Sequence, residues 1–310
     1  MPTQSEIQKQ ITDRIIEGLK NGVVPWRKPW RADKNSGSPA NVISKRPYSG
    51  INPILLDLVA MSRGYSSRYW GTYQQWNSLG AQVRKRPADD EAGQFGTSVI
   101  FYRQFKKTKV ENGEEKTEMF PVLPTFTVFN IDQVDGGSVD HLRASTDSDS
   151  SPLQADYEPA REAISATGAD IRFGGDRAFY TRPIGTFPDH HDGDYIQMPH
   201  PGQYIAQNEF ITTSFHELVH WSEVRLGWKG SYAMGELIAE IGACYATSQL
   251  GIPGSTDLGN HTAYLASWLK ELQSDPKAIM RAASQASKAT AFILGFSRQL
   301  EPEPEELQAV

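Results

Sequence analysis

The chain has 310 residues, of which 38% are hydrophobic and 22% charged, with a formal net charge of −6. This composition is typical of a water-soluble globular protein, and the absence of any run of 18 apolar residues argues against a membrane-spanning helix. Cys244 is the single cysteine, which excludes an internal disulfide, and the polar first residues do not resemble a signal peptide. We therefore expect a cytoplasmic protein with no membrane partner.

Charge is divided unevenly along the chain. Residues 1–136 contain 19 Lys and Arg against 14 Asp and Glu, an excess of five positive charges. The remaining residues contain 12 against 23, an excess of 11 negative charges. A positive excess confined to one half predicts a polyanionic partner for that half.

The first half is predicted to combine helices with a strand pair. Apolar residues at helical spacing, with stop signals such as Asn21-Gly22, predict helices at residues 3–20, 51–64 and 72–80. Residues 97–105 and 125–134 are rich in β-branched and aromatic side chains. They predict two antiparallel strands joined by a long, exposed hairpin loop. We therefore expect residues 1–136 to form a small α+β domain.

The second half is predicted to begin after a linker. Residues 137–156 are rich in Ser, Asp and Gly and poor in large apolar residues, as linkers often are. In the domain expected at residues 157–310, a helix should be followed by short strands near 170–175, 178–181 and 194–199. Four more helices should follow, at residues 208–227, 232–251, 261–273 and 276–294. Strands followed by helices indicate an α+β fold.

The stretch SFHELVHWSE, residues 214–223, carries two histidines four residues apart. Residues i and i+4 of an α-helix share one face, so His216 and His220 can reach one ion. Glu217 lies beside that face, close enough to hold a metal-bound water. A catalytic zinc site needs such a set, with a position left to water and a carboxylate as base. The alternative is that both histidines are ordinary surface or hydrogen-bonded residues of a helix.

A third ligand is expected from the next helix. The stretch GELIAE places Glu236 and Glu240 four residues apart in an apolar run, where carboxylates are costly to bury unless they are paired or bind metal. Glutamate-liganded metallopeptidases commonly have a second acid one turn after the ligand, which orients a histidine. That pattern favours Glu236 as the Zn²⁺ ligand and Glu240 as the residue that orients His216 or His220. The reverse assignment is open, and so is exposure of both glutamates at the helix rim.

Residues near this helix offer weaker candidates. Residues 194–200 could form an edge strand to which a peptide adds as an extra strand. Four side chains could donate a proton or stabilise an oxyanion, and the sequence does not choose among them: His200, Tyr204, Tyr232 and His261.

The first half interleaves aromatic and basic residues in the stretch PWRKPWR. Single-stranded bases stack on aromatic faces, while Lys and Arg neutralise phosphates, so this pattern favours single-stranded DNA. Any single tryptophan could equally be a core residue. The candidate DNA-binding residues are Trp26, Arg27, Lys28, Trp30, Arg31, Lys45, Arg46, Tyr48, Trp70, Tyr73, Arg84 and Lys85.

Seven stretches resemble, in order, successive blocks of the ArdC antirestriction family, which is related to the N-terminal region of TraC-type primases. The resemblance implies an N-terminal domain that binds single-stranded DNA and a C-terminal zincin-like metallopeptidase domain. It also implies a plasmid-borne role against host restriction during conjugation. The stretches, between about residues 5 and 295, are GVVPWRKPW, RPYSGINPILL, YWGTYQQWNSLGAQVRK, FTVFNIDQVDG, SFHELVHWSE, GELIAEIGACY and HTAYLASWLKEL.

Three functions are compatible with these patterns. The first is a single-stranded DNA binder fused to a zinc metallopeptidase, whose substrate would be a host protein such as a restriction component. The second is a DNA-shielding protein with a structural or vestigial metal site, against which the base Glu217 argues. The third is a metal-dependent nuclease, which the His-His-Glu set disfavours because nuclease metals prefer carboxylate-rich sites.

Overall fold

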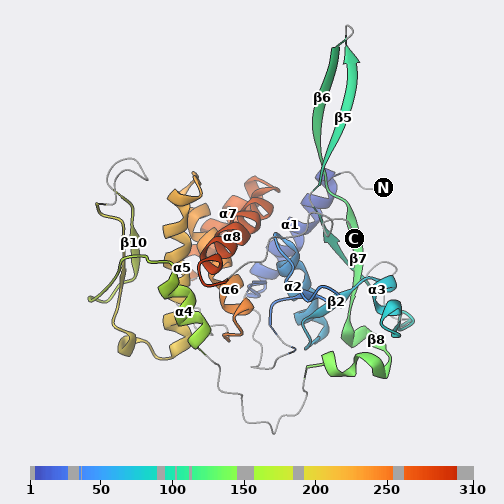
Figure 1. Ribbon diagram of the computed structural model, residues 1–310, viewed down its shortest axis with the longest axis horizontal. Helices are drawn as coiled ribbons and strands as arrows, with labels where there is room; N and C mark the ends of the chain where they lie inside the picture. The colour runs from blue at the N-terminus through green and yellow to red at the C-terminus, as the bar shows by residue number, and fades with distance from the viewer. Residues whose placement is uncertain are drawn as a thin grey trace.

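The computed structural model describes residues 4–26, 35, 37–88, 95–101, 103–111, 114–144, 157–183, 192–253 and 262–298 (Figure 1). The N-terminal half, blue to green in Figure 1, and the C-terminal half, yellow to red, lie side by side. Both halves mix helices and strands, which confirms the predicted α+β class.

The N-terminal half is built on a four-stranded sheet with the order β1-β2-β7-β4. β4 and β7 pair antiparallel, which confirms the predicted strand pair. The expectation of a loop between them was wrong, because this segment itself forms an antiparallel ribbon, β5–β6, that projects from the body (Figure 1). The elements of this half are α1 (Gln4–Lys20), β1 (Ala40–Asn41), α2 (Asn52–Arg63), β2 (Tyr69–Gly71), α3 (Tyr73–Ser78), β3 (Gln82–Val83), β4 (Thr97–Ile100), β5 (Arg103–Glu111), β6 (Glu114–Val122), β7 (Thr125–Asn130), η1 (Ile131–Gln133), β8 (Val134–Asp135) and η2 (Gly137–Leu142).

Local sequence signals explain where the short helix α3 begins and ends. The Thr72 side chain accepts a hydrogen bond from the Gln75 amide, and the Gln75 side chain accepts one from the Thr72 amide. This capping box satisfies two amides that a helix start leaves without partners. Gly80, just beyond the end of the helix, has a φ of 72°, which a glycine adopts without strain.

The C-terminal half packs long helices beside a small sheet with the order β10-β11-β9. β11 lies in the middle, paired with β10 on one side and β9 on the other, so the expectation that residues 194–200 form an edge strand was wrong. The elements of this half are α4 (Glu158–Ala166), β9 (Ile171–Phe173), β10 (Phe179–Thr181), β11 (Tyr195–Met198), η3 (Pro201–Gln203), α5 (Gln207–Arg225), α6 (Tyr232–Gln249), α7 (Thr262–Ser274) and α8 (Ala278–Gly295).

Helices α5 and α6 approach each other closely because a glycine faces the contact. A Cβ atom built on Gly242 would stand 2.7 Å from a methyl carbon of Val219 on α5. Only a residue without a side chain therefore allows this spacing. The close approach matters for function, since these two helices carry the candidate metal-site residues of the sequence: His216, Glu217, His220, Glu236 and Glu240.

One hydrophobic cluster runs through both halves. It joins α1 and α2 to the helices of the C-terminal half, and the indole of Trp26 meets that of Trp268 edge to face, with ring centroids 5.9 Å apart. Residues 137–144 of the expected linker are folded, with Val139 and Leu142 buried in the N-terminal half. Residues 145–156 lie outside the described residues. We keep the division into two domains as a proposal.

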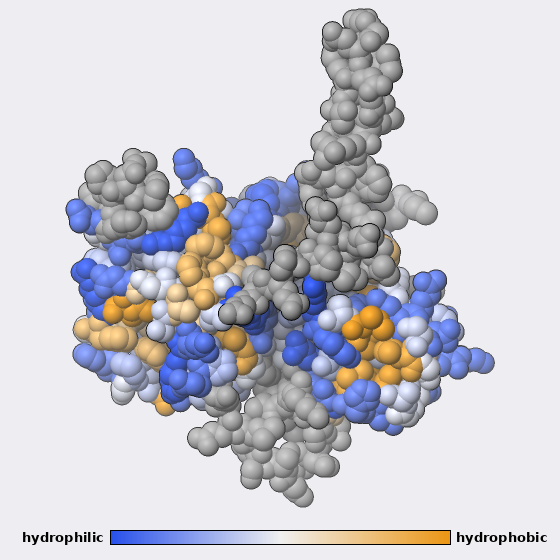
Figure 2. Space-filling model, viewed as in Figure 1, coloured by the Kyte–Doolittle hydropathy of each residue, from blue (hydrophilic) through white to orange (hydrophobic). Residues whose placement is uncertain are grey.

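Hydrophilic side chains cover much of the visible described surface, interrupted by apolar areas on both halves (Figure 2). In the described part of the chain, no helix has both the length and the hydropathy needed to cross a bilayer. Within the described ranges, the large hydrophobic side chains that remain exposed are Ile43, Tyr73, Phe173, Phe179, Ile205, Leu226, Tyr232 and Phe296.

Candidate metal centre

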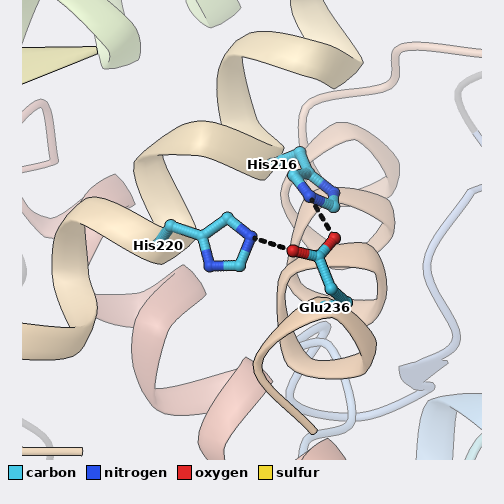
Figure 3. Close-up of side chains that lie close together, drawn as sticks. All are labelled: His216, His220 and Glu236. Atoms are coloured by element: carbon cyan, nitrogen blue, oxygen red, sulfur yellow. Dashed lines mark ion pairs between the residues drawn. The ribbon is translucent and has the colours of Figure 1, made fainter. Parts of the chain in front are cut away.

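Helices α5 and α6 bring three potential metal ligands together (Figure 3). The imidazoles of His216 and His220 lie one turn apart on α5, with ring centroids 5.0 Å apart. The Glu236 carboxylate on α6 faces both rings, with 3.5 Å from one oxygen to His216 Nε2 and 3.5 Å from the other to His220 Nε2. One ligand atom from each residue lies within 4.8 Å of the other two.

The chemistry of this set fits a divalent cation. Two imidazole nitrogens and one carboxylate form the three-ligand pattern of catalytic zinc sites. Burial alone would raise the pKa of Glu236, but hydrogen bonds from His216 and His220 outweigh it and hold the pKa far below its usual value. The carboxylate is therefore charged at neutral pH, as a metal ligand must be.

The other ring nitrogen of each histidine faces a second carboxylate. His220 Nδ1 lies 3.0 Å from Glu223 Oε1, and the second Glu223 oxygen is paired with Arg182. His216 Nδ1 lies 3.9 Å from Glu240 Oε2, an ion-pair distance rather than a hydrogen bond. Such contacts orient an imidazole and leave Nε2 free to bind a metal.

Glu223 is a site residue that the sequence reasoning missed. It is buried, and it follows His220 by three residues, a spacing that places both on one face of α5. That spacing was the available signal. Glu240 lies where it was expected, on the Nδ1 side of His216, whereas Glu236 faces the Nε2 atoms of both histidines.

Glu217 is buried beside the ligands, with 6% of its surface exposed. Burial is the main cause that raises its pKa, while the neighbouring His216 and His220 act in the opposite direction. The backbone of Tyr180 on β10 acts in the same direction as the two histidines and lowers this pKa. A carboxylate with a raised pKa suits proton transfer near neutral pH.

Tyr204, one of the candidate proton donors, lies close enough to Glu217 for the charge of that residue to affect its pKa. Its pKa is raised to about 12, mainly by burial and in part by the charge of Glu217. His200 instead stacks on Phe173, with ring centroids 6.1 Å apart. Tyr232 is exposed at the start of α6, and His261 lies outside the described residues.

Comparison with known proteins identifies the two halves. Residues 5–129 match the family model of the N-terminal domain of anti-restriction factor ArdC, and residues 158–285 match that of a zincin-like metallopeptidase. The metal-free crystal structure of the antirestriction protein ArdC from plasmid R388 is 33% identical, with a TM-score of 0.71, over 94% of this chain and 98% of that one. The chain belongs to the ArdC antirestriction family.

Further similarities extend this family. The Mn(II)-bound structure of the R388 ArdC protein is 32% identical, with a TM-score of 0.68, over 95% of this chain and 99% of that one. The uncharacterized protein y4eC of Sinorhizobium fredii is 31% identical, over 92% of this chain and 91% of its own length. A DNA primase TraC of Escherichia coli is 35% identical over 97% of this chain, which spans only 28% of that primase.

The residues expected to bind DNA fall into three groups. Trp26 and Trp70 are buried, with 5% and 1% exposed, as is Tyr48. None of these rings offers a face to a base, so we withdraw all three from the DNA surface. Arg27, Lys28, Trp30 and Arg31 lie outside the described residues. The residues that the structure leaves exposed are Lys45, Arg46, Tyr73, Arg84 and Lys85.

Proposed function

We propose that this member of the family is a zinc-dependent peptidase fused to a single-stranded DNA binder, and that it protects incoming DNA from host restriction during conjugation. The observation that carries the proposal is the convergence of His216, His220 and Glu236 beside the buried carboxylate of Glu217. A structural metal site has no need for that fourth residue. Glu217 therefore favours a peptidase over a DNA-shielding protein with a vestigial metal site.

Each residue of the centre has a defined task in peptide hydrolysis. His216, His220 and Glu236 would hold the ion through the two Nε2 atoms and the carboxylate. Zinc, when bound, polarises the substrate carbonyl and lowers the pKa of a coordinated water. Glu217 would accept the proton of the attacking water and pass it to the leaving amine.

The choice of zinc rests on the donor set and on the zincin-like domain, residues 158–285. The related R388 protein has been crystallised with Mn(II), so manganese is the competing metal. Equilibrating the apoprotein with equimolar zinc and manganese, followed by elemental analysis, distinguishes the two. Retention of manganese in preference to zinc would overturn this part of the proposal.

The DNA-binding part rests on the positive excess of residues 1–136 and on the ArdC-type N-terminal domain. The likeness to the TraC primases also supports it, although the chain spans only 28% and 20% of those two proteins. In this proposal the protein acts in the cytoplasm, and a host protein such as a restriction component is its peptidase substrate.

The test is to purify the protein, measure bound metal, and incubate it with casein and separately with single-stranded and duplex DNA. Glu236→Gln and Glu240→Gln form a matched pair, since both remove one buried negative charge from α6. We expect only Glu236→Gln to abolish stoichiometric zinc binding, because only Glu236 faces both Nε2 atoms. Retention of zinc by this variant and by His216→Ala and His220→Ala would refute the ligand assignment. Cleavage of DNA but not of casein would favour a nuclease.

A further inference from the structure

The charges on one stretch of the N-terminal half have a single sign. Residues 40–88 contain seven Lys and Arg and one acidic residue, Asp57. Asp57 is buried, so every exposed charge of this stretch is positive. A surface of this kind attracts polyanions. The basic residues are Lys45, Arg46, Arg63, Arg68, Arg84, Lys85 and Arg86.

Two of these side chains lie on a loop whose four residues, 43–46, are all exposed, and which we call the basic loop. Asn41 holds it: its side-chain oxygen accepts hydrogen bonds from the amides of Ile43 and Ser44, at 3.0 and 3.1 Å. Its backbone carbonyl accepts one from the Lys45 amide at 2.9 Å, and its amide donates to Arg46 at 3.0 Å. The basic loop therefore presents its side chains without first having to become ordered.

Backbone strain marks the same loop. Lys45 has a φ of 59°, and no other non-glycine residue in the described part of the chain has a positive φ. This conformation costs free energy for a lysine, whereas asparagine or glycine would adopt it more readily. Strained residues of this kind concentrate at binding and catalytic sites.

Aromatic rings adjoin the basic loop. The Lys45 ammonium lies over the Tyr69 ring, 4.5 Å from its centroid. The Asn41 amide group donates to the Gln75 side chain at 3.1 Å, which ties the loop to α3. Tyr73, at the start of α3, is 51% exposed. Cationic groups and an accessible ring therefore share one surface.

Lys45 is also available to an anion. Among the described residues, no carboxylate lies within ion-pair distance of its ammonium, which lies over the ring of Tyr69. Anchoring by a ring leaves the charge uncompensated and holds it in place. A phosphate group would supply the missing negative partner.

We propose that the basic loop, with Tyr69 and Tyr73, is the surface that binds single-stranded DNA. Lys45 and Arg46 contact consecutive phosphates, and a base stacks on the exposed face of Tyr73. The exposed ring favours a single strand over a duplex, whose bases have no free face. The exposed ring also favours nucleic acid over an acidic protein, because an acidic protein could bind by charge alone and would need no accessible ring. The inference rests on the proposed DNA-binding function and gives that function a location.

The test measures binding of a fluorescent 20-residue oligothymidine to the full-length protein by anisotropy, over a series of salt concentrations. Lys45→Gln with Arg46→Gln should weaken binding at least tenfold and flatten the salt dependence by up to about two phosphate contacts. Tyr73→Ala should weaken binding roughly 5- to 150-fold with little change in salt dependence. The matched control, Lys270→Gln with Lys288→Gln, removes two exposed charges from the C-terminal half and should bind like wild type.

The outcomes separate this proposal from the proposed function. Wild-type protein that binds no oligothymidine would overturn both. Wild-type binding that survives in both loop and ring variants would overturn only this location. Equal affinity for a duplex of the same length, or full competition by polyglutamate, would overturn the single-stranded DNA assignment. All the substituted side chains are exposed, so the variants should fold, and circular dichroism checks that they do.

Discussion

Replacing Glu223 should weaken metal binding although all three metal ligands remain in place. Its carboxylate lies 3.0 Å from His220 Nδ1, and its other oxygen is paired with Arg182. The contact fixes the ring so that Nε2 faces Glu236, 3.5 Å away. Without it, His220 loses both its orientation and the negative charge that makes the imidazole a better ligand.

The structure predicts how the losses of zinc affinity should rank when the carboxylates near the site are replaced. Loss of a partner that orients a histidine ligand typically costs 10–100-fold in metal affinity, about 1.4–2.8 kcal/mol. Glu223→Ala should fall in this range, and Glu223→Gln should cost less, because the amide oxygen still accepts from Nδ1–H. Glu240→Ala should cost less than tenfold, since 3.9 Å separates Glu240 from His216 Nδ1. Arg182→Ala should have little effect, since the arginine side chain is 61% exposed and water screens its charge.

The assay is a competition between each apoprotein and a chromophoric zinc chelator at fixed pH. Because Glu223 is buried, the melting temperature of each EDTA-treated variant must also be measured, so that loss of folding is not mistaken for loss of affinity. Unchanged zinc affinity in a folded Glu223→Ala protein would refute this reasoning. A larger loss in Glu240→Ala than in Glu223→Ala would refute it as well.

Three further changes test catalysis and packing. Glu217→Gln should retain zinc, but its rate of peptide hydrolysis should fall at least a hundredfold, since the amide cannot accept the proton of water. Full casein cleavage by this variant would remove Glu217 from the mechanism. Trp26→Ala should lower the free energy of unfolding by about 3–5 kcal/mol in urea titrations, and a loss under about 1 kcal/mol would contradict its burial. Gly242→Ala should cost about 1–3 kcal/mol, because the new methyl would stand 2.7 Å from Val219, whereas Gly202→Ala, in open space, should be close to neutral.

The metal centre could be anticipated because its geometry is local. A spacing of four residues determines which side chains share a helix face, whatever the rest of the fold does. The sequence therefore indicated that His216 and His220 could converge, and that a carboxylate of the next helix could join them. It favoured Glu236 over Glu240 as the ligand but left the reverse assignment open, because that distinction depends on the rotation of α6 against α5. The close approach at Gly242 sets that packing.

The DNA surface was harder to anticipate because it depends on burial. Trp26 and Lys45 both belong to basic, aromatic stretches, and the composition of these stretches does not show which residue is buried and which is exposed. The indole of Trp26 packs against α7, a helix more than 230 residues away in the chain, so only the tertiary fold shows that it is a core residue. The sequence named Lys45 and Arg46 among its candidates but could not show that they lie on an ordered loop, since that order comes from the hydrogen bonds of Asn41.

The shared core determines how the two proposed activities have to be studied. Gly50 follows the basic loop closely, and both of its backbone groups are bonded by the C-terminal half: its carbonyl accepts from the Tyr245 hydroxyl and its amide donates to Ser287, each at 2.8 Å. Tyr245 lies on α6, the helix that carries Glu236. A fragment ending at residue 136 would lose these bonds and expose the apolar faces of α1 and α2 that the long helices now cover. If such a fragment failed to bind DNA, the cause could be the lost packing or a missing DNA contact. Only substitutions in the full chain can separate these two causes.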